Sequence, residues 1–248
     1  MSGKQAPANR RKARRGARPK KSGVRAKPRN AYHHGDLRAA LVEAALLMVE
    51  QGGPKAVTLR GAARMAGVSQ TAPYRHFEDK QALLAAVAEE GFRALGAEIG
   101  KAAAPLAQDP LERLRALAVA YVCFAAEHPS SFRVMYDPET ADRSAHTALA
   151  EASNRVFSGI VATVEECQEM GLLRRKSVFD NVVVAWSALH GLASLIVEGQ
   201  ARMLRIDEHS PQSLASLICD RLLEGLGAQD SGVVQIRRHQ GSTGHTVG

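Results

Sequence analysis

The sequence predicts an all-α protein in which an N-terminal domain of three helices, built around a helix-turn-helix, precedes a larger helical domain. Ala and Leu dominate the apolar positions. Hydrophobic residues make up 45% of the chain but aromatic residues only 4%, a composition that favours helices over sheets. Apolar residues also recur at helical spacing, and no segment shows convincing strand-like alternation. The 248 residues suffice for one large domain or two small ones.

The N-terminal half predicts four helices in succession. The first spans 36–51, with Asp36 as its N-cap and Gly52-Gly53-Pro54 as its end. Two short helices follow at 58–65 and 69–77, separated by Ala66-Gly67-Val68. A longer helix runs from 79 to 103 and ends before Pro105.

The second half is helical as well. Helices are expected at 111–127, 130–136, 141–170, 178–203 and 211–226, with Pro129, Pro138 and Gly171 at their boundaries. This gives about nine helices in total, and no segment repeats another.

The charge of the chain is distributed unevenly. Residues 1–30 hold twelve of the 33 basic residues and no acid, which leaves 21 bases against all 25 acids in the remainder, or −4. We interpret 1–31 as a disordered basic arm and 228–248, rich in Gly, Ser and His, as a disordered tail. A basic arm indicates a polyanionic partner, most commonly nucleic acid. The alternative is that the arm only keeps the protein in solution.

Several function classes find no support. Cys123, Cys167 and Cys219 are odd in number and far apart, so neither a disulfide framework nor a zinc cluster is indicated, and a reducing cytoplasm fits. The longest uninterrupted apolar run, 116–126, is too short to span a membrane, and the N-terminus is not a secretory signal. His33 and His34 lack a nearby third ligand, so no metal site is predicted. No cofactor site is predicted either.

The segment 58–77 carries the strongest functional signal. Thr58 can cap a short helix whose apolar face contains Ala62 and Ala63, and Gly67 can adopt the positive φ that turns the chain. Ser69 can cap the second helix, after which Tyr74 and Phe77 are expected to return towards the core. This is the pattern of a helix-turn-helix, although an ordinary helical hairpin is the alternative.

In a helix-turn-helix, the first residues of the second helix reach base edges in the major groove. Gln70, Thr71 and Ala72 occupy those positions, and their amide, hydroxyl and methyl groups suit base contacts. Other side chains and capped backbone N–H groups are placed for phosphates, which supply affinity rather than sequence recognition. They are Thr58, Ser69, Tyr74, Arg75, His76 and Lys80.

Residues 35–95 resemble the DNA-binding domain of TetR-family regulators. The matching residues are Thr58-Leu59, Ala62-Ala63, 66–69, Tyr74 to Phe77, and Lys80 with Leu83-Leu84. The segments 32–38 and Trp186-Ser187-Ala188-Leu189-His190-Gly191 resemble a subgroup with a W-x-x-x-H-G signature in its C-terminal domain. Pro73 departs from the wider family and disfavours helical geometry at Ala72, so which of residues 70–72 contacts bases stays open.

The resemblance implies that 96–227 forms a helical domain that binds a small-molecule inducer and dimerises. Trp186 and His190 share a helix face and can line a pocket, although both also suit an ordinary core. The pocket candidates are Tyr121, Phe124, Phe132, Met135, Tyr136, Phe157, Trp186 and His190. The dimer-interface candidates on the last two long helices are Leu192, Ile196, Ile218, Leu222 and Leu226.

The sequence therefore predicts a cytoplasmic, homodimeric repressor that binds a palindromic DNA operator and is released by a ligand. Repression rather than activation is taken from the family's prevalent mode. A second hypothesis is an architectural protein that coats DNA through its basic arm, which deletion of the arm would distinguish. An enzyme is not predicted, because no phosphate loop, paired catalytic carboxylates or catalytic triad stands out.

Overall fold

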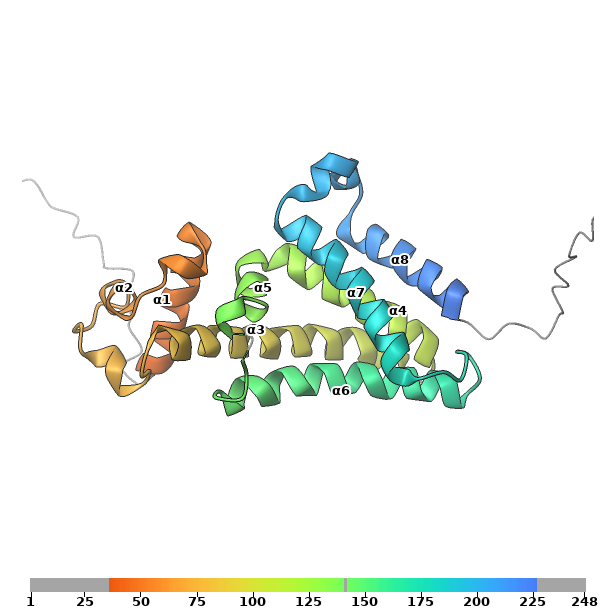
Figure 1. Ribbon diagram of the computed structural model, residues 1–248, viewed down its shortest axis with the longest axis horizontal. Helices are drawn as coiled ribbons and strands as arrows, with labels where there is room; N and C mark the ends of the chain where they lie inside the picture. The colour runs from red at the N-terminus through yellow and green to blue at the C-terminus, as the bar shows by residue number, and fades with distance from the viewer. Residues whose placement is uncertain (1–35, 141, 227–248) are drawn as a thin grey trace, which may run out of the picture. The chain divides into compact units, whose positions relative to one another are not determined.

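The computed structural model describes residues 36–140 and 142–226, and these residues form eight α-helices, short 3₁₀ segments and no β-strand (Figure 1). The all-α prediction is confirmed. The predicted basic arm, 1–31, and the predicted tail, 228–248, lie outside the described residues. The α-helices are α1 (Leu37–Gly52), α2 (Leu59–Met65), α3 (Lys80–Ala103), α4 (Pro110–Glu127), α5 (Pro129–Met135), α6 (Thr147–Glu169), α7 (Val178–Val197) and α8 (Pro211–Leu226).

Side-chain caps define where the N-terminal helices begin. The Asp36 carboxylate accepts a hydrogen bond from the Ala39 N–H at 2.9 Å, and the Thr58 hydroxyl accepts from the Gly61 N–H at 3.0 Å. Asp79 caps α3 in the same way through the Ala82 N–H. Each cap satisfies a backbone donor that would otherwise lack a partner. The helix starts predicted from the capping residues Asp36 and Thr58 are confirmed to within one residue, and so is the start predicted at 79, where the cap itself was not predicted.

The predicted helix over 69–77 is wrong, which is why eight α-helices are found in the described residues rather than about nine. In its place lies a turn followed by a 3₁₀ segment, Ala72–Arg75. Pro73 explains the difference, since it has no N–H to donate and disfavours α-helical geometry at the residue before it.

Two longer helices are shorter than predicted. The helix expected at 141–170 begins only at Thr147, because the Asp142 carboxylate binds the N–H and hydroxyl of Ser144 and holds a local turn. The helix expected at 178–203 ends at Val197, since Gly199 adopts a left-handed conformation with φ 68°.

Helix α3 packs against α1, α4, α5 and α6. Helices α1 and α5 pack against it, while α6 and α4 lie along its length (Figure 1). Its side chains Leu83, Leu84, Phe92 and Leu95 are fully buried. Helices α7 and α8 pack on α4 and on each other. Because α3 contacts both the N-terminal helices and α4–α6, it belongs to both predicted domains.

One buried carboxylate ties the N-terminal helices together. Glu89 on α3 lies 3.1 Å from the Arg38 guanidinium on α1 and 2.6 Å from Arg93 one turn along α3. Its side chain is only 6% exposed, whereas both arginines are about half exposed. The two hydrogen-bonded cations compensate for burying the charge of Glu89.

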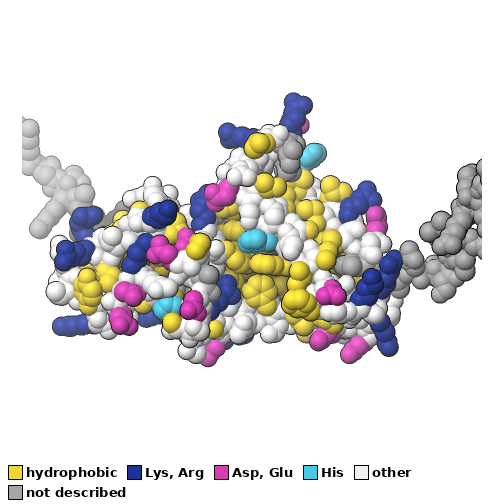
Figure 2. Space-filling model, viewed as in Figure 1, with side chains coloured by type: hydrophobic (Ala, Val, Ile, Leu, Met, Phe, Trp, Pro, Cys, Tyr) yellow, Lys and Arg dark blue, Asp and Glu magenta, His cyan; other side chains and the backbone are white. Residues whose placement is uncertain are grey.

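Helix α7 is strongly apolar, although much of its surface is not buried by the rest of the chain. By length and composition alone it could cross a membrane, and only 22% of its most apolar stretch is buried. The sequence analysis predicted a helix here but, because it considered only uninterrupted apolar runs, did not mark it as long and apolar enough to span a membrane. Phe179, Val183 and Val184 on α7 and Leu217 on α8 are exposed, and we call these four residues the apolar α7 face. Figure 2 shows hydrophobic side chains gathered over α7 and its neighbours.

Candidate DNA-binding surface and ligand cavity

Helix α2 and the turn after it form the scaffold of the candidate DNA-binding surface. Ala62 and Ala63 are completely buried, which brings α2 close to its neighbours. Gly67 takes the predicted positive φ, 69°, and the Val68 N–H then donates to the Ala63 carbonyl at 3.0 Å. A β-carbon on Gly61 would lie 2.8 Å from the Thr58 hydroxyl oxygen, so this position also requires a small residue. The predicted turn between the two halves of the motif is confirmed.

The segment after this turn is fixed to the core by two residues. Pro73 is fully buried and Phe77 is 4% exposed. The Pro73 carbonyl accepts hydrogen bonds from the N–H groups of both His76 and Phe77 at 2.9 Å. The Arg38 guanidinium lies 5.8 Å from the centre of the Phe77 ring, which adds a cation–π contact. These anchors determine which side chains between them face outward.

Most of the residues predicted to contact DNA are exposed together in this segment. Gln70, Thr71, Arg75 and His76 are exposed, and Ala72 is half-buried. Tyr74 is 54% exposed, so the expectation that it returns to the core is wrong. Within the 3₁₀ turn, Pro73 takes the inward position instead. The Ser69 hydroxyl bonds the Thr71 hydroxyl at 3.3 Å rather than capping a helix.

Thr58 and Lys80 are engaged within the chain. Thr58 is exposed, and its hydroxyl caps α2. The Lys80 ammonium lies 3.1 Å from a carboxylate oxygen of Glu139, in the 3₁₀ segment Pro138–Thr140. The Gln81 amide donates to the Glu139 carbonyl at 2.9 Å. The start of α3 is thus bonded to the segment that follows α5.

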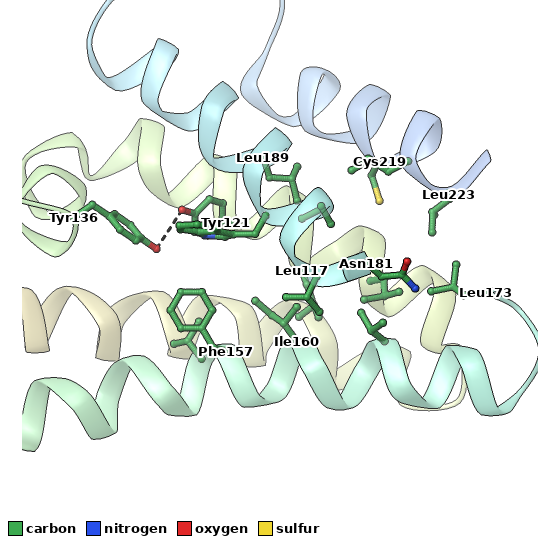
Figure 3. Close-up of a pocket in the computed structure, with 18 residues that line it drawn as sticks. Leu117, Tyr121, Tyr136, Phe157, Ile160, Leu173, Asn181, Leu189, Cys219 and Leu223 are labelled. Carbon is green, nitrogen blue, oxygen red and sulfur yellow. Dashed lines mark hydrogen bonds between the residues drawn. The ribbon is translucent and has the colours of Figure 1, made fainter. Parts of the chain in front are cut away.

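A cavity of about 90 Å³ lies among α4, α6, α7 and α8 (Figure 3). Its eighteen lining residues include no charged side chain. They are Leu114, Leu117, Ala118, Tyr121, Tyr136, Val156, Phe157, Ile160, Val164, Leu173, Asn181, Val182, Ala185, Trp186, Leu189, Cys219, Leu222 and Leu223. A mostly apolar cavity with a few polar groups is the usual form of a small-molecule site.

The cavity contains some of the predicted pocket residues. Tyr121, Phe157 and Trp186 line it, as does Tyr136. Phe124, Phe132 and Met135 are buried in other parts of the core and do not line it. His190 lies behind the cavity wall, in a neighbouring shallow hollow that it shares with Tyr136.

Tyr121, Tyr136 and His190 form a hydrogen-bonded cluster at one end of the cavity. The Tyr121 hydroxyl lies 3.2 Å from the Tyr136 hydroxyl and 2.8 Å from Nδ1 of His190. Because it has one proton, it donates in only one of these hydrogen bonds, and the tautomer of His190 decides which. Burial raises the pKa of both tyrosines and lowers the pKa of His190. The cluster is therefore uncharged at neutral pH.

Sequence reasoning missed Asn181 and the aliphatic lining residues. Asn181 is 5% exposed, and its amide nitrogen has no hydrogen-bond partner. A signal exists in the sequence, because Asn181 stands one and two helical turns before Ala185 and Leu189, on the same face of α7. A lone amide on an apolar face indicates a specific polar role.

The dimer-interface candidates are dispersed. Leu192 is buried within the chain and Leu222 lines the cavity, while Ile196 and Ile218 are half-buried. Leu226 ends α8, and its side chain lies outside the description. The most exposed apolar side chains on these two helices belong to the apolar α7 face.

A buried turn that presents exposed polar and basic residues, joined to a helical domain with its own cavity, defines a helix-turn-helix transcriptional regulator. Comparison with known families agrees with this class. Residues 41–87 match the bacterial regulatory proteins of the tetR family, and residues 114–221 match the tetracyclin repressor-like C-terminal domain. Together these matches span more than half of the chain, which therefore belongs to the TetR family of DNA-binding transcriptional regulators.

Solved structures have the same fold. A protein with unknown function from Rhodococcus sp. RHA1 is 35% identical, with a TM-score of 0.69 over 80% of this chain and 99% of that one. The TetR-family regulator PfmR from Thermus thermophilus is 21% identical, with a TM-score of 0.58 over 77% of this chain and 99% of that one. The fatty acid degradation regulator FadR from Bacillus halodurans is 15% identical, with a TM-score of 0.58 over 76% of this chain and 98% of that one. The last two show the fold alone, and no curated protein matches the sequence.

Proposed function

We propose that this regulator is a cytoplasmic, homodimeric repressor that leaves a palindromic operator when a small molecule enters the cavity. One observation carries the proposal: Tyr136 lines the cavity, and the chain immediately after it, through Glu139, bonds the start of α3. The start of α3 directly follows the recognition segment 70–77. A change in the cavity thus has a short covalent and hydrogen-bonded route to the DNA-binding surface.

Operator recognition is assigned to the exposed recognition segment. Gln70 and Thr71, with the Ala72 methyl, are suited to base edges. Tyr74, Arg75, His76 and Ser69 are suited to phosphates, as is the N-terminus of α2 at Thr58. Lys80 is proposed to hold the segment in position through Glu139, besides reaching a phosphate when that ion pair opens. Each recognition segment covers few base pairs, so specificity requires two copies related by a two-fold axis.

The apolar α7 face is the proposed centre of the dimer. An exposed apolar surface of this kind is unfavourable in water unless a partner covers it. Ile196 and Ile218 are partly exposed beside it. A β-carbon on Gly191 would meet no atom within 4 Å, so this position on α7 has open space for a partner helix. The W-x-x-x-H-G segment would then contribute Trp186 to the cavity, His190 to the cluster behind it and Gly191 to the interface.

Ligand entry requires the cavity walls to move. About 90 Å³ is less than the ~150 Å³ of an engineered cavity that binds benzene. A larger ligand must therefore displace Tyr136 or the helices around it. If that displacement shifts Glu139, the two recognition segments of the dimer no longer match successive major grooves, and the ligand shifts the population towards the DNA-free state.

The test is a footprint of the purified full-length protein on the DNA upstream of its own gene, at about 50 mM and about 200 mM salt. A protected, roughly palindromic site that persists at the higher salt supports the proposal. Diffuse protection that disappears with salt, and is lost on deletion of 1–31, would favour the architectural alternative. Added small molecules that abolish a specific footprint would establish release by ligand.

A further inference from the structure

The amide of Asn181 is a buried hydrogen-bond donor without a partner. The residue is 5% exposed, and no hydrogen-bonding group accepts from its Nδ2. A buried amide of this kind destabilises the folded state unless something satisfies it. Native proteins contain few such groups, and each requires an explanation.

The position of Asn181 supplies that explanation. It lines the cavity near Leu173 and Leu223, towards the end opposite Tyr121 and Tyr136 (Figure 3). At the tyrosine end, the polar groups bond one another: the two tyrosine hydroxyls form one hydrogen bond, and Tyr121 forms another with His190. The Asn181 end is surrounded by aliphatic side chains. The unused donor therefore lies at the apolar end of the cavity.

We infer that the cavity takes an uncharged, mainly apolar molecule with a carbonyl-type oxygen, such as a long-chain ketone or ester, and that this oxygen accepts a hydrogen bond from Asn181. This inference rests on the proposed ligand-binding function and specifies the chemistry of that site. A carboxylate or phosphate is excluded because none of the lining residues carries a positive charge, and an unpaired buried anion is strongly unfavourable.

Trp186 provides a direct readout. It is the single tryptophan of the chain and lines the cavity, so all tryptophan fluorescence comes from a residue of this site. The probes are 2-undecanone, n-undecane and undecanoate, which have the same chain length and differ in the oxygen. The full-length protein is titrated with each, and binding is checked by the shift in thermal unfolding.

The expected result is that the ketone binds the native protein about 5- to 10-fold more tightly, relative to its partitioning into octanol, than the alkane. Undecanoate binds more weakly than either. In Asn181→Leu, which keeps the branched shape and the number of heavy atoms and removes the donor, the preference for the ketone disappears. Leu222→Met is the matched control, since it changes a lining side chain without removing a polar group, and it keeps the ketone preference.

Two results would overturn the inference. Equal relative binding of ketone and alkane to the native protein does so, a measurement that does not depend on whether Asn181→Leu folds. A ketone preference that survives Asn181→Leu does so as well. In both cases ligands still enter the cavity, and the proposed function stands. If no probe changes Trp186 fluorescence or the unfolding temperature, both the inference and the ligand-binding function of this cavity are wrong.

Discussion

The ammonium nitrogen of Lys80 lies 3.1 Å from a carboxylate oxygen of Glu139, although the two residues are 59 positions apart in the chain. Lys80 begins α3 and follows the recognition segment, whereas Glu139 follows the cavity residue Tyr136 by three positions. The ion pair, with the hydrogen bond from Gln81 to the Glu139 carbonyl, is a direct contact between the two functional parts of the molecule.

A double-mutant cycle measures the strength of this contact. Because both side chains are partly exposed, at 31% and 42%, we expect a coupling of ~0.2–1 kcal/mol between Lys80→Met and Glu139→Gln in urea unfolding. The coupling should shrink at high salt. The control is a second cycle that pairs Lys80→Met with Glu90→Gln, on the exposed side of α3, and it should show no coupling free energy. A coupling of zero at low salt would remove this ion pair from the proposed route.

Substitutions in the recognition segment separate specificity from affinity. Arg75→Ala should weaken binding to operator and unrelated DNA alike and reduce the salt dependence by about one phosphate contact. Gln70→Ala should weaken operator binding alone, by ~1–3 kcal/mol, and relax the preference at one base pair. Fluorescence anisotropy with both DNAs at several salt concentrations checks this. Identical behaviour of the two variants would contradict the assignment of Gln70 to bases.

Removal of the Glu89 carboxylate should destabilise the protein. Glu89→Gln loses its charge-assisted hydrogen bonds to Arg38 and Arg93, and water can solvate the half-exposed arginines. We therefore expect a loss of ~1–3 kcal/mol, and a Tm lower by ~2–4 °C for each kcal/mol. Glu90→Gln is the matched control, because Glu90 follows Glu89 in the chain and its side chain is exposed. Equal Tm values for the two variants would show that the buried network contributes no net stability.

Local features of the fold were predictable, because they depend on neighbours in the sequence. Asp36, Thr58 and Asp79 cap helices through N–H groups only three positions away, and Gly67 turns the chain through its own φ. The effect of Pro73 is also local, yet the segment was still predicted as a helix. A capping residue, Ser69, and apolar spacing suggested a helix there, but proline geometry prevailed.

The cavity and its link to α3 were not predictable in the same way. Leu117, Ile160 and Leu189 look like ordinary core residues, and only the packing of α4, α6 and α7 shows that they leave space between them. The prediction favoured aromatic residues such as Phe124 and Phe132, which are buried in the core but do not line the cavity. No pattern in the sequence pairs Lys80 with Glu139, because that contact depends on how α5 packs against α3.

The stability of the protein should fall as the pH decreases below the ordinary pKa of histidine, in part because of His190. Burial lowers the pKa of His190 in the folded state, so the unfolded chain binds a proton first as the pH falls below about 6.5. Stability present above that pH is therefore lost progressively below it. Tyr121 and Tyr136, which contact the imidazole, stay protonated throughout.

His190→Gln should reduce the slope of unfolding free energy against pH between about pH 6.5 and 5, measured by urea unfolding. His209→Gln, at an exposed site, should leave that slope unchanged. A slope unaffected by His190→Gln would contradict the burial of a neutral imidazole.

A charge on the apolar α7 face should dissociate the proposed dimer. Val183 is 40% exposed and lies one helical turn from Phe179, which is 73% exposed. An aspartate at position 183 would remain hydrated in the monomer but would lose its water among the apolar side chains of a dimer interface. We therefore expect Val183→Asp to sediment as a monomer at micromolar concentration, to keep its helical circular dichroism, and to lose most of its affinity for a palindromic operator, since one recognition segment then binds alone. Met170→Asp, at an exposed apolar residue just beyond α6, is the control and should remain dimeric. A dimer that persists in Val183→Asp would place the interface elsewhere on the molecule, and a monomeric native protein would contradict the proposed dimer itself.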